Sequence, residues 1–179
     1  ELVSVMKNTG KVFHTGYMYR YNPYIQELLT QIENGELGDI SSVEAQMNCI
    51  HPAATRQWRE NLPGGMMFYL GCHLVDLIFR IQGKPKRILP LNTCSGLDGV
   101  TAKDFGFTVF EYENGVSFAK TCDVERGSFL RRQLVICGEK GTIEIKPLEV
   151  LEGDGQYTVS NECYHYEWHK PWETSKTDI

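Results

Sequence analysis

The amino-acid sequence predicts an α+β fold: a large, predominantly antiparallel sheet with helices packed on one face. Apolar residues recur at helical spacing in two stretches, residues 23–33 and residues 63–83. From residue 87 onward the pattern changes to a period of two, which is typical of strands. The sequence Glu113-Asn114-Gly115 joins two of these strands, and Asn-Gly turns favour antiparallel hairpins. Helices followed by hairpin-linked strands indicate one sheet that is covered on a single face.

The first half of the chain is expected to alternate helices and strands. Asn22 is a good N-cap, and Pro23 suits the first position of a helix that stops at Asn34-Gly35. In order, the expected elements are a helix over residues 1–8, a strand over 12–18, a helix over about 23–33, a strand over 39–50 and an irregular stretch over 51–62. Because the first helix is short and lacks a preceding cap, we expect the sequence to begin inside a larger protein.

The second half is expected to supply most of the sheet. Its predicted strands span residues 87–93, 103–112, 116–124, 130–137, 142–146 and 156–168. The residues after Lys170 are polar, and no core-forming element is expected there. Apolar and aromatic residues occupy both phases of residues 105–110, so the sheet face away from the helices is expected to pair with a second copy of the chain.

The helix over residues 63–83 is apolar on most sides and is the element around which a site would be built. Its polar exceptions, Tyr69, His73, Asp76 and Arg80, are spaced to share one face. Such a line in a buried helix points either to a cavity, ligand or partner, or to a satisfied internal network in which His73 binds Asp76 and Arg80 caps the pair. The pattern alone leaves both interpretations open.

Composition excludes several classes of function. The 179 residues carry a formal net charge of −5 with no clustered basic face, which argues against nucleic-acid binding. No uninterrupted apolar run is long enough to span a membrane, and no secretory signal opens the sequence. Six cysteines without a Cys-x-x-Cys pair suit a reducing cytoplasm better than a disulfide framework or a zinc ribbon.

Two further groups of residues are candidates for a binding site, but each could also be ordinary exposed surface. Arg56 and Trp58 lie in a predicted loop and either decorate the surface or line the pocket that the polar line faces. His165, Glu167 and His169 alternate along a predicted strand, where they could bind a divalent ion or simply be exposed. The exposed interpretation is favoured, so no metal is predicted. There is no P-loop and no Gly-x-Gly-x-x-Gly fingerprint.

Four ordered segments resemble one protein family. They are Gly64-Gly65 followed by Leu70-Gly71-Cys72-His73-Leu74-Val75-Asp76, the stretch from Thr15 to Pro23, the stretch from Asn34 to Ile40, and the stretch from Val135 to Glu144. Together they are similar to the glucose–fructose oxidoreductase, inositol dehydrogenase and MocA family (Gfo/Idh/MocA). The last thirty residues add little to the resemblance.

The resemblance implies a two-domain, NAD(P)-dependent oxidoreductase that acts on a sugar, a cyclitol or a related polyol. Residues 1–17 would be the last helix and strand of a mostly missing Rossmann domain, which binds most of the NAD or NADP. Residues 18–179 would form the substrate-binding and oligomerisation domain, truncated at its C-terminus. The fragment alone is expected to be inactive. The parent protein is expected to be cytoplasmic and to form a homodimer or a higher homo-oligomer through the sheet face.

The resemblance also assigns roles to single residues. His73 falls on the family's active-site histidine, and Tyr69 stands where the family commonly has an aspartate. Arg20 and Asn22 fall at the boundary where the family's cofactor and substrate meet. Together with Arg56 and Trp58 from the predicted loop, Arg20 and Asp76 are the candidate substrate-binding residues, and Tyr17 and Asn22 are the candidate cofactor-binding residues. Because a phenol lacks the charge of a carboxylate, a non-catalytic sugar-binding or dimerisation module is the alternative function.

Overall fold

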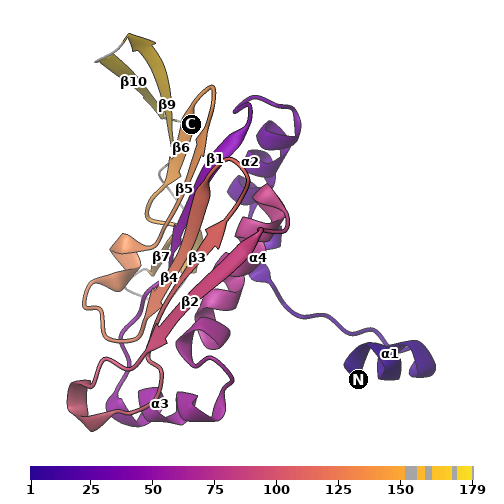
Figure 1. Cartoon of the computed structure of the whole chain (residues 1–179), viewed down its shortest axis with the longest axis vertical. Coiled ribbons are helices and arrows are strands. Elements are labelled where there is room, and N and C mark those ends of the chain that lie inside the picture. Colours follow the sequence, from indigo (N-terminus) through magenta and orange to yellow (C-terminus); the bar gives the residue numbers. More distant parts are fainter. Residues whose placement is uncertain (152–156, 160–162, 171–172, 179) are drawn as a thin grey trace.

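The computed structural model describes the backbone of residues 1–151, 157–159, 163–170 and 173–178, and the side chains of residues 1–148. These residues form an eight-stranded sheet with helices on one face, which confirms the predicted fold class (Figure 1). The helices are α1 (Leu2–Thr9), α2 (Pro23–Glu33), α3 (Ala53–Trp58) and α4 (Cys72–Gln82). The strands are β1 (Ile40–Gln46), β2 (Arg87–Thr93), β3 (Phe105–Glu111), β4 (Val116–Cys122), β5 (Gln133–Gly138), β6 (Thr142–Ile145), β7 (Glu149–Leu151), β8 (Tyr157–Val159), β9 (Cys163–Lys170) and β10 (Glu173–Asp178).

The strand order of the main sheet is β10-β9-β6-β5-β1-β4-β3-β2, and β7 pairs with β8 separately. Every neighbouring pair in the main sheet is antiparallel except β1 and β4, which run parallel. Consequently the carboxyl ends of β1 and β4 lie at the same edge of the sheet, although the two strands are far apart in sequence.

The core lies between the sheet and helices α2 and α4. Alternate residues of the central strands are buried on this side: Val43, Ala45, Phe110, Ala119, Leu134 and Ile136. Helix α4 covers them with Leu74, Leu77 and Ile78, and α2 adds Ile25 and Leu28. Each fully buried aliphatic side chain of this kind contributes about 1.5–3 kcal/mol relative to exposure. The apolar faces that the strand and helix patterns predicted therefore pack together in one core.

Two expectations about local structure are wrong. Residues 11–17 form no strand; they are extended chain with Val12 96% exposed, because no described strand lies beside them to accept hydrogen bonds. Residues 51–62 are not irregular, since α3 and a 3-10 turn (Arg59–Asn61) occupy most of them. Beyond Lys170, where no core-forming element was expected, β10 pairs with β9, and its side chains lie outside the described residues.

The predicted central helix has two parts. A π-helical turn (Met67–Gly71) leads into α4, which ends at Gly83, where φ is 74° and ψ is −152°, a backbone conformation that favours glycine. Single π turns occur frequently at functional sites because they re-aim the side chains they carry. In the described part of the chain, no helix is both long and apolar enough to cross a membrane.

Candidate functional site

His73 is the centre of the polar line on α4. Its ring is half-buried and packs edge-on against Tyr17 and Tyr19, with both centroid separations at 6.0 Å. Burial lowers the pKa of His73, and the nearby Asp76 carboxylate opposes this more weakly. Nδ1 is buried and has no hydrogen-bond partner among the described residues. A buried polar atom without a partner is rare in proteins, which marks this ring as a candidate for function.

Asp76 is paired with Arg20 and not with His73. Arg20 donates from Nε to Oδ2 of Asp76 at 2.7 Å and from Nη2 to Oδ1. The hydrogen bond that Arg20 donates to Asp76 is the main reason that the pKa of Arg20 is raised. The alternative of a satisfied network of His73, Asp76 and Arg80 is therefore wrong, because Arg20 takes the carboxylate and Arg80 is exposed.

A cavity of about 580 Å³ lies beside this line, between the α4 region and β2. Tyr17 and the Arg20–Asp76 pair stand on its wall, together with Cys72 and Asn92. The structure thus brings together three of the predicted site residues. His73 is not among the lining residues; its neighbour in sequence, Cys72, is.

Tyr69 lies in the π turn and is 43% exposed. Its ring faces the guanidinium of Arg59, whose Cζ lies 4.1 Å from the ring centroid. Arg59 is fully buried, and its Nε lies 2.8 Å from Oδ2 of Asp123. The sequence pattern did not distinguish Arg59 from an ordinary exposed loop residue, because its carboxylate partner, Asp123, follows β4 and is far away in the sequence.

Three other predicted site residues are placed elsewhere. Arg56 is buried against Asp104, with Nη1 3.0 Å from Oδ2, and also binds Asp98. Trp58 is exposed on α3 and does not line the cavity between α4 and β2. Asn22 caps α2, since its Oδ1 accepts from the backbone N–H of Tyr24 at 2.9 Å. The structure does not bring these residues to His73.

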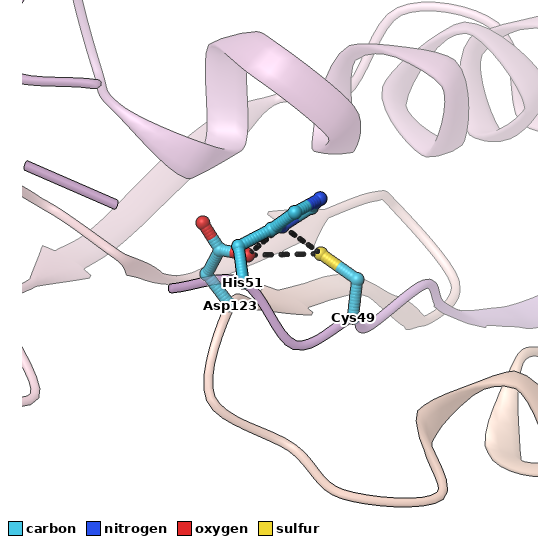
Figure 2. A group of neighbouring side chains, drawn as sticks. All are labelled: Cys49, His51 and Asp123. Atoms are coloured by element: carbon cyan, nitrogen blue, oxygen red, sulfur yellow. Dashed lines mark hydrogen bonds and ion pairs between the residues drawn. The ribbon is translucent and has the colours of Figure 1, made fainter. Parts of the chain in front are cut away.

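A second polar cluster lies where β1 and β4 end. Figure 2 shows the side chains of Cys49, His51 and Asp123 converging, with Nδ1 of His51 hydrogen-bonded to Oδ1 of Asp123. Sγ of Cys49 lies 3.1 Å from that oxygen and 3.3 Å from Nδ1. Burial, with help from Asp123, raises the pKa of the Cys49 thiol, so the thiol remains protonated. The cluster was not identified from the sequence, because Cys49 and His51 follow β1 and Asp123 follows β4, more than 70 positions later.

Metal binding at this cluster is opposed by its neighbours. The Cys, His and carboxylate atoms are close enough together to hold an ion. However, Arg59 is ion-paired with Asp123, and its Nη2 lies 3.1 Å from Nδ1 of His51. A guanidinium already supplies the positive charge, and a protonated thiol is a poor ligand. The other metal candidate, His165, Glu167 and His169, has its side chains outside the described residues.

Comparison with known proteins places the chain in a family. Residues 25–144 match a family model described as the GFO/IDH/MocA C-terminal domain. The chain is 26% identical over 150 residues to a bovine (Bos taurus) trans-1,2-dihydrobenzene-1,2-diol dehydrogenase. The alignment covers 81% of this chain and 42% of that protein. The chain thus spans less than half the length of this curated relative.

Solved structures show the same fold. An inositol dehydrogenase homolog from Azotobacter vinelandii, complexed with NADH and myo-inositol, matches with a TM-score of 0.76 at 19% identity, over 99% of this chain and 45% of that chain. A levoglucosan dehydrogenase, in complex with NADH and levoglucosan, matches with a TM-score of 0.75 at 14% identity, over 98% and 49%. At these identities the likeness establishes the fold. Because the family model covers well over half of the sequence, the chain belongs to the GFO/IDH/MocA family of oxidoreductases and contains its C-terminal domain.

Proposed function

We propose that this chain is the substrate-binding and oligomerisation domain of an NAD(P)-dependent oxidoreductase that acts on a sugar, a cyclitol or a related polyol. Family membership supports the reaction class. The substrate class is supported by fold relatives that were solved with NADH and myo-inositol or levoglucosan. The five described cysteines are free thiols, which fits a reducing cytoplasm.

The cofactor would be held mainly outside the described residues. In residues 1–148 there is no strand–glycine-loop–helix unit of the kind that binds a dinucleotide pyrophosphate, so these residues do not by themselves fit NAD(P). We propose that residues 1–17 end a Rossmann domain, that residues 18–179 form the second domain, and that Tyr17 contacts the cofactor where the two meet. The short span of this chain within its relatives supports that division. The fragment alone is then inactive.

The observation that carries the proposal is the unpaired Nδ1 of His73. Burial lowers the pKa of His73, which keeps the ring neutral near pH 7 and able to accept a proton from a substrate hydroxyl. Bound nicotinamide would supply the hydride acceptor. Tyr69 offers a phenol that can donate to or accept from the same oxygen. Arg20 and Asp76, on the cavity wall, would bind and orient neighbouring hydroxyls.

The test is turnover by the intact parent protein with NAD or NADP and a panel of polyols and sugars. Replacing His73 by Ala is expected to lower kcat by about 100-fold or more, as for other general acid–base groups. Arg80→Ala is the control, because Arg80 is an exposed residue two turns further along the same helix. An unchanged rate for the His73 variant would remove this histidine from the mechanism.

A non-catalytic sugar-binding or dimerisation module is the second candidate. It is favoured by Tyr69, whose ring is stacked on Arg59 and supplies no carboxylate to the reacting carbon. In that case the intact protein would bind polyols with no turnover, and His73→Ala would weaken binding only.

We further propose that the chain assembles through the open face of its sheet. Leu89 and Leu91 on β2 are exposed on the same face as Phe107 and Val109 on β3. Phe118 on β4 stacks on Phe107, with ring centroids 5.3 Å apart. An apolar sheet face of this kind is normally covered by another element or another subunit.

A further inference from the structure

The guanidinium of Arg59 is held along its edges by three groups. Its Nε lies 2.8 Å from Oδ2 of the fully buried Asp123. Its Nη1 donates to the backbone carbonyl of Thr55 at 2.8 Å, and its Nη2 lies 3.1 Å from Nδ1 of His51. Because the nitrogens of a guanidinium lie in one plane, these three partners set the tilt of its flat face as well as its position.

The flat face of this guanidinium is turned to the ring of Tyr69. Cζ of Arg59 lies 4.1 Å from the ring centroid, which is a contact distance. A cation holds an aromatic ring most firmly when the cation is removed from water, and Arg59 is only 1% exposed. Tyr69 itself is largely open to solvent on its outer side. The orientation of the ring is therefore set from its inner side, by Arg59.

The ring is the part of Tyr69 that still needs to be held. Its backbone N–H already donates to the carbonyl of Gly65 at 3.0 Å within the turn that begins the helix. Tyr69 precedes His73 by four residues, so both side chains project from the same side of the helix. The phenol oxygen lies at the far end of the ring, and a displacement of a reacting group by about 1 Å can lower a rate about 100-fold.

We propose that Arg59 is a positioning residue, which holds the ring of Tyr69 so that the phenol oxygen meets the reacting hydroxyl of the substrate beside His73. The proposal rests on the proposed function of His73 and Tyr69. Arg59 is buried and does not line the cavity between α4 and β2, so it acts through Tyr69 and does not touch the substrate. It breaks no bond and moves no proton.

The experiment is a double-mutant cycle on kcat and KM of the intact parent protein, with NAD or NADP and the polyol or sugar that it turns over fastest. The variants are Arg59→Lys, Tyr69→Phe and the two combined. Lys keeps a positive charge beside Asp123 but has no flat face for the ring, and Phe keeps the ring but has no hydroxyl.

Arg59→Lys is expected to lower kcat about tenfold or more, with KM changed by less than about threefold, since no substrate-binding group is removed. In the Tyr69→Phe background the same substitution is expected to change kcat by less than about twofold, because no hydroxyl is left to position. A purely structural role of Arg59 would lower kcat equally in both backgrounds.

Arg132→Lys is the matched control. Arg132 is also buried, and its Cζ lies 4.0 Å from the ring centroid of Phe129, so the substitution removes a similar stack without touching Tyr69. Its kcat is expected to equal that of the wild type. Arg59→Gln is a second variant with the same expectation as Arg59→Lys, because its amide can donate to Asp123 but carries no charge. Urea unfolding verifies that each compared variant is folded.

Three results would overturn this inference alone. They are a wild-type kcat in the folded Arg59 variants, an equal loss of kcat with Tyr or Phe at position 69, and a wild-type kcat for Tyr69→Phe. Each leaves the role of His73 untouched, because His73→Ala tests that role separately. A wild-type parent protein that turns over no polyol or sugar would instead refute the proposed function, and this inference with it.

Discussion

Arg59 is the residue that links the two polar clusters. Its guanidinium lies under the ring of Tyr69 on one side and is ion-paired with the buried carboxylate of Asp123 on the other. Its Nη1 also donates to the carbonyl of Thr55 at 2.8 Å. A buried cation with these partners fixes the position of Tyr69 as well as that of the β4 terminus.

Replacing Arg59 by Met should lower the free energy of unfolding by about 3–5 kcal/mol, because Asp123 would be left as a buried charge without its cation. Arg87→Met is the matched control. Arg87 pairs with Glu111 on the exposed surface, where such a pair is worth about 0–1 kcal/mol. Urea unfolding at neutral pH measures both. If both variants lose the same free energy of unfolding, the buried Arg59–Asp123 pair contributes no more to stability than an exposed ion pair.

The lowered pKa of His73 makes stability depend on pH. Burial disfavours the charged ring in the folded state, so the unfolded chain binds the proton more readily. Stability from this group is complete above the ordinary pKa of 6.5 and is lost as the pH falls from there toward the lowered folded value. Urea unfolding of wild type and His73→Phe across this range should show a steeper acid loss in the wild type. Parallel curves would contradict the prediction.

At the scale of elements, the turn that precedes α4 depends on a glycine. Gly65 has φ +58°, and a Cβ there would lie 2.2 Å from the carbonyl oxygen of Lys103. That same oxygen accepts the backbone N–H of Met66 at 2.8 Å, so the loop cannot move away without losing the bond. The glycine therefore anchors the start of the π turn that carries Tyr69.

Replacing Gly65 by Ala should destabilise the protein by about 2–4 kcal/mol, since backbone strain and a steric clash add together. Gly96→Ala separates the two effects. Gly96 is left-handed, with φ 71° and ψ 1°, but a Cβ there meets nothing within 4 Å, so only about 1 kcal/mol is expected. Thermal or urea unfolding gives both values, and similar losses would mean that the contact with Lys103 is relieved at little cost.

Local signals predicted those elements whose causes are local. Asn22 and Pro23 fixed the start of α2, and Gly83 fixed the end of α4. The Asn114-Gly115 turn was also local, and Tyr112 donates its N–H to the carbonyl of Gly115 at 2.9 Å. The strand predicted over residues 12–18 is absent, because an apolar run becomes a strand only when a partner strand is present.

The site was predictable only where it follows one helix. Tyr69, His73 and Asp76 could be grouped by helical spacing, and their order matched the family. The pairing of Asp76 with Arg20 spans 56 positions, and that of His51 with Asp123 spans 72. Such pairs are set by sheet topology, which a single sequence does not reveal. For the same reason, the sequence did not reveal that Arg56 is buried against Asp104 and is not on a loop surface or beside His73.

At the scale of the whole molecule, the open sheet face is expected to decide the oligomeric state. Replacing Phe107 by Glu should convert the proposed dimer to a monomer, because a charge would be buried against the partner's apolar face. Sedimentation at micromolar concentration measures this. Tyr24→Glu is the control, since Tyr24 is exposed on α2, on the side of the sheet that the helices cover. A wild-type chain that sediments as a monomer would refute the assembly.

The central position of β1 also governs how the protein is made. Ala45 pairs with Ala119 on one side and with Leu134 on the other, so both neighbours of β1 are translated long after it. At about 5–20 residues per second, a nascent chain holds this apolar strand without partners for several seconds. Until β4 and β5 have been made, the exposed apolar strand is open to misfolding and to capture by chaperones.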